Sequence, residues 1–286
     1  MPAFPRRKKT GAPRAPRFSR LKRFGRRAED KAGPRGRGIY LLPNAFTTGA
    51  LFCGFYAIVM AMNQRFEHAC WAVFIAMILD GLDGRVARLT NTQSEFGAQY
   101  DSLSDMVSFG AAPALVMYEW SLRGLGKLGW IAAFVYCAGA ALRLARFNTN
   151  IEVVDKRFFQ GLPSPAAAAL VVGFIMFMTD PDINISARQV DWVSWCIAVF
   201  AGLTMVSNVP FYSFKDVNFR KSVPFIVVFL IALGFALVAI DPPKVLWPIF
   251  VVYGLSGYVV FVLQRARGKK VSIIPTDEPI DETERR

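Results

Sequence analysis

The stretch LDGLDGRVARLTNTQSEFGAQYDSLSDMVSFG, residues 79–110, places four aspartates beside some of the most apolar sequence in the chain. Asp80 and Asp83 are three residues apart, and Asp101 and Asp105 are four residues apart. Residues at these spacings share one face of an α-helix. We therefore expect two antiparallel helices, joined by the short polar turn between them, with their acidic faces close together.

The chain around this stretch has the composition of a membrane protein. It has 286 residues, of which 53% are hydrophobic, and its mean hydropathy is +0.33. A helix needs roughly 20 apolar residues to cross the hydrocarbon core. Eight windows meet this length, and they cover residues 43–62, 68–89, 99–120, 127–147, 163–180, 191–211, 222–240 and 244–263. The sequence thus predicts an all-α polytopic membrane protein.

The basic residues indicate the orientation of these windows, because Lys and Arg gather in short loops on the cytoplasmic side of a membrane. With both termini inside, 29 of the 34 Lys and Arg residues lie on that side. Fourteen of them fall in residues 1–38, a segment rich in Pro and Gly without apolar periodicity. We expect a disordered cytoplasmic arm that binds the anionic inner leaflet. No nucleic-acid partner is expected, because no reader motif accompanies the arm.

Four carboxylates near the cytoplasmic ends of two spans repel one another, and each costs several kcal/mol unless its charge is compensated. Oxygen ligands select hard cations such as Mg²⁺, Mn²⁺ or Ca²⁺. The chain has a single histidine, His68, and four cysteines without C-x-x-C spacing, so a zinc or haem site is not expected. Two alternatives remain open here: helix caps paired with Arg85 and Arg88, or the cation relay of a transporter.

The aspartates belong to a longer pattern, D-x-x-D-G-x-x-A-R-x8-G-x-x-x-D-x-x-x-D, whose other fixed positions are Gly84, Ala87, Arg88 and Gly97. At every fixed position this pattern resembles the signature of the CDP-alcohol phosphatidyltransferases. The resemblance implies that an alcohol oxygen attacks the β-phosphorus of a CDP-linked lipid and that CMP leaves. It also implies a six-helix catalytic core.

Composition and the resemblance together predict four parts. Residues 1–38 are expected to form the basic arm, and residues 39–215 the six-helix core. Residues 216–264 add two transmembrane helices beyond the minimal family fold, and residues 265–286 form a cytoplasmic tail.

The same resemblance assigns roles to individual residues. It implies that Asp80, Asp83 and Asp101 bind two divalent cations. It implies that Asp105 contacts a metal ion and is the general base for the attacking hydroxyl. The residues that resemble nucleotide contacts of the family are Asn44, Thr47, Gly84, Ala87, Arg88 and Gly97. Helix capping is an alternative explanation for Asn44.

The acceptor alcohol has to be inferred from other segments. TTGALFCGF (47–55), ALRLARFNT (141–149), FFQGLPSPAAAA (158–169) and SNVPFYSFK (207–215) resemble the bacterial, membrane-embedded (type II) members that transfer the phosphatidyl group to serine. This resemblance implies CDP-diacylglycerol and L-serine as substrates, a homodimer, and a bacterial cytoplasmic (inner) membrane with the active site on the cytoplasmic face. Glycerol phosphate, inositol, inositol phosphate and choline remain alternative acceptors for the same chemistry.

Three basic residues are candidates for an anion pocket that binds the acceptor or the lipid phosphate. Arg143 and Arg146 lie three residues apart near the cytoplasmic end of their span, and Lys215 lies after the sixth window. Guanidinium groups suit carboxylates and phosphates because they can donate two parallel hydrogen bonds. The alternative is that all three only anchor the chain at the cytoplasmic face.

Overall fold

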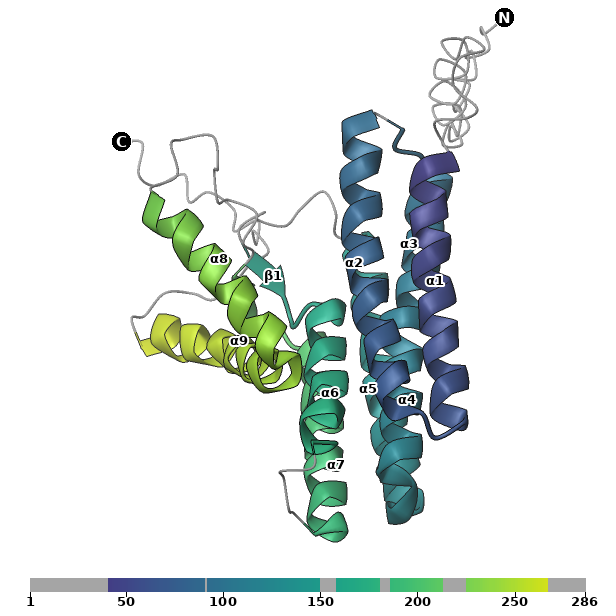
Figure 1. The fold of residues 1–286 in the computed structure, drawn as a ribbon, viewed down its shortest axis with the longest axis vertical. Helices are drawn as coiled ribbons and strands as arrows, with labels where there is room; N and C mark the ends of the chain where they lie inside the picture. The colour runs from purple at the N-terminus through teal and green to yellow at the C-terminus, as the bar shows by residue number, and fades with distance from the viewer. Residues whose placement is uncertain (1–40, 91, 150–157, 181–185, 213–224, 267–286) are drawn as a thin grey trace, which may run out of the picture. The chain divides into compact units, whose positions relative to one another are not determined.

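The computed structural model describes residues 41–90, 92–149, 158–180, 186–212 and 225–266. The basic arm and nearly all of the C-terminal tail lie outside the described residues, so their expected roles stay predictions. The described part is mainly helical (Figure 1). Its helical segments are α1 (Leu41–Met62), α2 (Phe66–Thr90), α3 (Glu95–Asp105), the π-helix η2 (Met106–Ala111), α4 (Ala112–Trp120), the 3-10 helix η3 (Leu122–Leu125), α5 (Lys127–Thr149), α6 (Ser164–Met178), α7 (Ala187–Val206), α8 (Phe225–Ile240) and α9 (Pro242–Ala266).

Helical segments occupy each window that the hydropathy predicts. Among the described residues, 4 helices are long and apolar enough to cross a membrane: Pro43–Met62, Lys127–Thr149, Arg188–Val206 and Pro242–Leu263. The expected class, a polytopic helical membrane protein, is therefore confirmed. The number of spans stays a prediction, because α6 and α8 have only 15 and 16 residues.

The third window, expected to form one helix over 99–120, is divided in the structure. α3 ends at Asp105, and the π-helix η2 leads from there into α4. Within η2, the carbonyl oxygen of Phe109 accepts a 2.9 Å hydrogen bond from the hydroxyl of Tyr136 on α5. A side-chain donor of this kind stabilises a stretch that departs from α-helical pairing. The π-helix thus begins directly after the last aspartate of the signature.

The sixth window was expected to reach residue 211, and this boundary was wrong. α7 ends at Val206, and Pro210–Tyr212 forms a strand, β2, that pairs antiparallel with β1 (Phe158–Gln160). Proline has no backbone N–H for a helical hydrogen bond, so it favours this change. Gly161 follows β1 with a φ of 75°, and a Cβ atom there would lie 2.3 Å from the carbonyl oxygen of Met205. Only glycine fits this turn.

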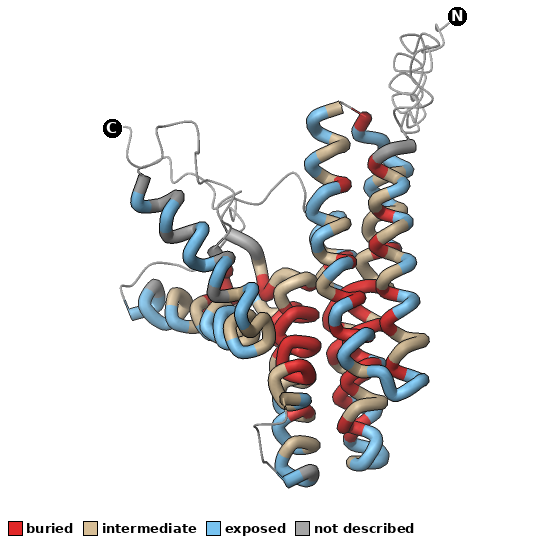
Figure 2. The backbone as a smooth tube through the Cα atoms, in the orientation of Figure 1, coloured by how far each residue is buried: buried red, intermediate tan, exposed pale blue. Residues whose placement is uncertain are grey.

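Small residues let the helices approach closely, as is common in membrane proteins. A Cβ atom at Gly139 on α5 would lie 2.4 Å from the carbonyl oxygen of Gly202 on α7. α6 is deeply buried, and every residue from Ala167 to Met176 is inaccessible or nearly so (Figure 2). The core therefore forms around α6 and the closely packed pair of α5 and α7.

Candidate functional site

The acidic faces of α2 and α3 meet in the structure. Asp80 on α2 and Asp101 and Asp105 on α3 each offer a carboxylate oxygen, and these oxygens lie within 4.8 Å of one another. The side chains also approach in pairs, since Asp80 interacts with Asp105 and Asp83 interacts with Asp101. Carboxylates at such separations repel one another strongly unless a cation or a shared proton lies between them.

The oxygen atoms of the cluster fit a hard divalent cation. Oδ1 of Asp101 is buried and has no hydrogen-bond partner among the described residues. A buried carboxylate oxygen without a partner loses its hydration and receives nothing in return, whereas a metal ion would satisfy it. All ligand atoms are carboxylate oxygens, the type that Mg²⁺, Mn²⁺ and Ca²⁺ prefer. The cluster can therefore hold a divalent cation.

Asp83 differs from the other three aspartates in its hydrogen bond to the first helix. Its side chain is buried, and Oδ2 accepts a 2.7 Å hydrogen bond from the hydroxyl of Thr47 on α1. Thr47 is buried too, so this bond forms away from bulk water and holds the carboxylate in one orientation. The neighbouring Thr48 is exposed and contacts the hydroxyl of Tyr100 instead.

The connection between α2 and α3 explains why the two acidic faces meet. At the end of α2, the backbone N–H of Thr92 donates to the carbonyl oxygen of Ala87, and its hydroxyl lies 2.7 Å from that of Thr90. Ser94 then caps α3, because its hydroxyl oxygen accepts a hydrogen bond from the backbone N–H of Gly97. These local bonds close a short turn that makes the helices antiparallel neighbours.

Two serines that the sequence reasoning missed, Ser104 on α3 and Ser108 on η2, bond to the backbone of α1. The hydroxyl of Ser104 donates to the carbonyl oxygen of Thr47 at 3.1 Å, and that of Ser108 donates to Ala50 at 3.0 Å. A Cβ atom at Gly54 would lie 2.7 Å from Cα of Ser108, so the backbones nearly touch there. Two serines four residues apart within the predicted window 99–120 were the available signal, because such hydroxyls commonly bond a neighbouring helix.

The expected nucleotide contacts gather at the ends of the same helices. A Cβ atom at Gly97 would lie 3.6 Å from the side-chain oxygen of Asn44, so that the small residue leaves room beside this amide. On α2, a Cβ atom at Gly84 would lie 3.8 Å from a guanidinium nitrogen of Arg88. Ala87, one turn along from Gly84, contributes its carbonyl oxygen to the turn described above. Their roles in binding stay predictions.

The two arginines of α5 have different surroundings. Arg143 donates from Nη1 to the hydroxyl of Ser164 at 2.8 Å, its Nε is buried without a partner among the described residues, and it interacts electrostatically with Asp105. Arg146 donates to the side chain of Asn208 and to the carbonyl oxygen of Val206, so it joins α5 to the end of α7. Lys215 lies outside the described residues.

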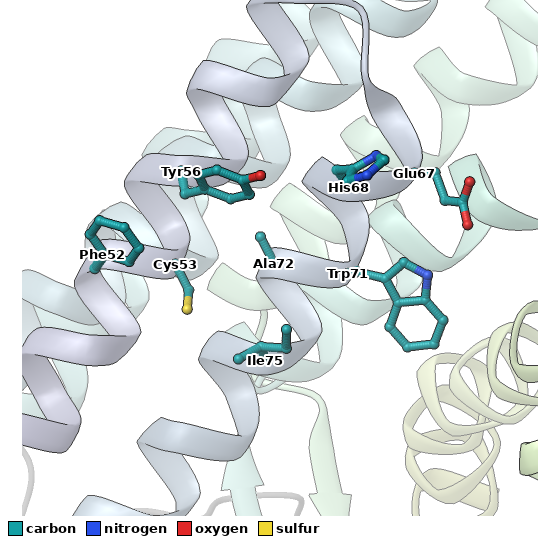
Figure 3. Close-up of a pocket in the computed structure, with 8 residues that line it drawn as sticks. All are labelled: Phe52, Cys53, Tyr56, Glu67, His68, Trp71, Ala72 and Ile75. Carbon is teal, nitrogen blue, oxygen red and sulfur yellow. The ribbon is translucent and has the colours of Figure 1, made fainter.

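An apolar pocket of about 350 Å³ lies between α1 and the first turns of α2 (Figure 3). Aromatic and aliphatic side chains form its walls, and Glu67 and His68 lie at its edge (Figure 3). None of the four aspartates lines it. Its composition suits hydrocarbon contact better than polar chemistry, so the carboxylate cluster remains the candidate site.

Comparison with known proteins identifies the family. The profile of the CDP-alcohol phosphatidyltransferase family matches residues 40–209, which include the four aspartates. A protein of Helicobacter pylori named CDP-diacylglycerol--serine O-phosphatidyltransferase is 35% identical over 226 residues, covering 79% of this chain and 94% of that protein. Proteins with the same name are 31% identical in Mycobacterium tuberculosis (77% of this chain, 78% of that protein) and 36% identical in Methanocaldococcus jannaschii (65% and 82%). The chain belongs to the CDP-alcohol phosphatidyltransferase family.

Proposed function

We propose that this chain transfers the phosphatidyl group from CDP-diacylglycerol to L-serine and releases CMP. The carboxylate cluster of Asp80, Asp101 and Asp105 carries the proposal, because it occurs at the spacing of the family signature and can hold a divalent cation. Relatives that share 31–36% of their residues with this chain are named for serine as the acceptor. Family and relatives therefore support the same reaction.

The aspartates would hold two divalent cations, Mg²⁺ or Mn²⁺, with Ca²⁺ as an alternative. When bound, such ions neutralise charge on the pyrophosphate and assist the departure of CMP. Thr47 keeps the carboxylate of Asp83 in its orientation through the 2.7 Å hydrogen bond. In the proposed single displacement, the serine hydroxyl oxygen forms a bond to the β-phosphorus while the bond from phosphorus to the CMP oxygen breaks. Asp105 accepts the hydroxyl proton.

Other residues would bind the substrates around this centre. Arg88 is suited to a phosphate of the nucleotide, and Asn44 and Gly97, which lie next to each other, would contact the cytidine part. Arg143 would bind the carboxylate of serine or the lipid phosphate. We also propose a homodimer in a bacterial cytoplasmic membrane, with the site on the cytoplasmic face, where serine and nucleotide are available.

Acceptor choice is tested by CMP release from CDP-diacylglycerol by the purified protein with a panel of alcohols and a divalent cation. We expect serine to support release at least tenfold faster than glycerol phosphate, inositol, inositol phosphate or choline, since a site that binds one polar acceptor disfavours others that leave its polar groups unpaired. CMP release with a different alcohol alone would show that the acceptor is that alcohol and would leave the proposed reaction type unchanged. CMP release with none of them would contradict the proposed transferase activity, and cation flux in proteoliposomes would then support a transporter.

The two arginines of α5 give a second prediction. Arg143→Ala is expected to raise the KM for serine at least about tenfold, because a buried charge-assisted pair is removed, with less effect on the KM for CDP-diacylglycerol. Arg146→Ala is the matched variant three residues away. From the sequence alone, Arg146→Ala would raise the KM for serine to a similar extent. The hydrogen bonds of Arg146 to the end of α7 instead predict that Arg146→Ala lowers the melting temperature and leaves both KM values unchanged. Equal effects of Arg143→Ala on both KM values would contradict a role in binding serine and would support the alternative that Arg143 anchors the chain at the cytoplasmic face.

A further inference from the structure

The π-helix η2 interrupts the third window just before a proline. In an α-helix, the carbonyl oxygen of Phe109 would accept a hydrogen bond from the backbone N–H four residues later, but that residue is Pro113, which has no N–H. Phe109 is fully buried, so bulk water cannot replace the missing donor. The hydroxyl of Tyr136 on α5 donates to this oxygen at 2.9 Å. A neighbouring helix thus supplies the donor that the proline lacks.

Tyr136 is a firm anchor for this bond. The residue is buried, and its backbone lies directly against α7, because a Cβ atom at Gly202 would lie 2.8 Å from Cα of Tyr136. One turn along α5, η2 meets the same helix again, because a Cβ atom at Gly110 would lie 3.2 Å from Cβ of Ala140. η2 therefore rests on α5 over two consecutive turns.

The π turn changes the direction in which the acidic face of α3 points. In an uninterrupted α-helix, Asp105 would share one face with Ala112 and Val116, which are fully buried in the core. In η2, however, the backbone N–H of Ala112 donates to the carbonyl oxygen of Val107, five residues earlier. One additional residue in a turn rotates the preceding side chains by about 100° relative to the following ones. The aspartates are thereby turned away from the apolar face of α4.

We infer that Tyr136 is a positioning residue for Asp105, which it holds in place by fixing the π turn of η2 to α5. η2 starts directly after Asp105, and the hydroxyl of Ser108 fixes the same turn to the carbonyl oxygen of Ala50 on α1. Without the hydroxyl of Tyr136, the carbonyl oxygen of Phe109 loses a donor and the turn loses its bond to α5. The carboxylate of Asp105 then loses its fixed position. The inference rests on the proposed function, and specifically on Asp105 as the base.

The test compares Tyr136→Phe with Tyr258→Phe in the full-length protein, by CMP release with serine and a divalent cation. Tyr136→Phe keeps the buried ring and removes only the hydroxyl. We expect kcat to fall about tenfold and both KM values to stay within about twofold of wild type, because a displaced base slows the chemical step. Unchanged kcat would overturn the inference.

Tyr258→Phe is the matched control, because it removes a hydroxyl that lies 2.7 Å from that of Thr204 and joins α9 to α7. Its kcat should stay within about twofold of wild type. Equal losses of kcat in Tyr136→Phe and Tyr258→Phe would overturn the inference, since they would show a general loosening of helix packing.

Pro113→Ala separates positioning from stability. It restores a backbone N–H that can donate to Phe109 in the α-helical pattern. Added to Tyr136→Phe, it should recover the melting temperature while kcat stays low, because the new bond favours a turn without the π-helical form. Recovery of kcat as well would overturn the inference, since the hydroxyl would then serve stability alone. The same double variant provides the rate measurement if Tyr136→Phe alone does not fold.

Asp105→Asn shows whether Tyr136 acts through Asp105. If it does, adding Tyr136→Phe to Asp105→Asn should lower the residual rate by less than about twofold. A further loss of about tenfold would overturn the inference, because the hydroxyl would then act independently of Asp105. Absence of serine-dependent CMP release in the wild-type protein would instead contradict the proposed function itself.

Discussion

Asp105→Asn is expected to lower the rate of CMP release with serine on the order of 10³-fold. Asparagine has nearly the shape of aspartate and keeps one oxygen for a metal ion, but it cannot accept the proton of the attacking hydroxyl. Asp105 is suited to that task because its carboxylate lies beside those of Asp80 and Asp101, where the reacting phosphate would be held. Initial rates at saturating CDP-diacylglycerol and serine measure the effect, and the thermal shift on adding CDP-diacylglycerol shows whether donor binding is retained.

Glu95→Gln provides the control for this loss. Glu95 is an exposed acid in the first turn of the same helix, α3, and lies outside the carboxylate cluster. The same change from acid to amide there should leave the rate within about twofold of wild type, as surface substitutions usually do. Turnover of Asp105→Asn within tenfold of wild type would contradict its role as the base. Loss of the donor-induced thermal shift would show that the variant fails in binding rather than in proton transfer.

The aspartate cluster could be predicted from the sequence because it depends on local rules. Helical spacing places Asp80 and Asp83 on one helix and Asp101 and Asp105 on the next, and the short turn leaves few ways for the helices to be arranged. The helical windows were predictable for the same reason, since hydropathy reports directly on burial in lipid or in the core. Only the ends and interruptions of the helices differ from the expectation.

Those differences depend on partners far away in the sequence. The π-helix after Asp105 relies on the hydroxyl of Tyr136, and the turn at Gly161 relies on the backbone near Met205. Arg143 and Arg146 illustrate the same limit. Their spacing of three suggests one shared role, yet the structure gives Arg146 partners at the end of α7 and gives Arg143 a hydrogen bond to Ser164 on α6. Spacing along a helix predicts which residues share a face, whereas the contacts of that face depend on how the neighbouring helices pack.

The second large effect concerns divalent cations. Removing them with a chelator is expected to stop CMP release completely, and Mg²⁺ or Mn²⁺ should restore it. The reason is electrostatic, because the cluster brings carboxylates within 4.8 Å of one another and leaves Oδ1 of Asp101 without a hydrogen-bond partner among the described residues. A ligand that binds only the folded state adds about 2.7 kcal/mol of stability at 100 times its Kd. Addition of metal should therefore raise the melting temperature of the wild-type protein as well as its activity.

Asp101→Asn should be more stable than the wild type without metal and less stable than the wild type with metal. Without metal, the variant has one charge fewer in the cluster, so we expect it to melt about 3 °C above the metal-free wild type. With saturating Mg²⁺ or Mn²⁺, the wild type should become the more stable of the two, since the variant has lost an anionic ligand. Glu95→Gln should behave as wild type in both conditions. A metal site at these aspartates would be contradicted if neither metal changed the melting temperature of the wild type. It would also be contradicted if metal raised the melting temperature of Asp101→Asn equally, because repulsion and metal binding would then not involve the same oxygens.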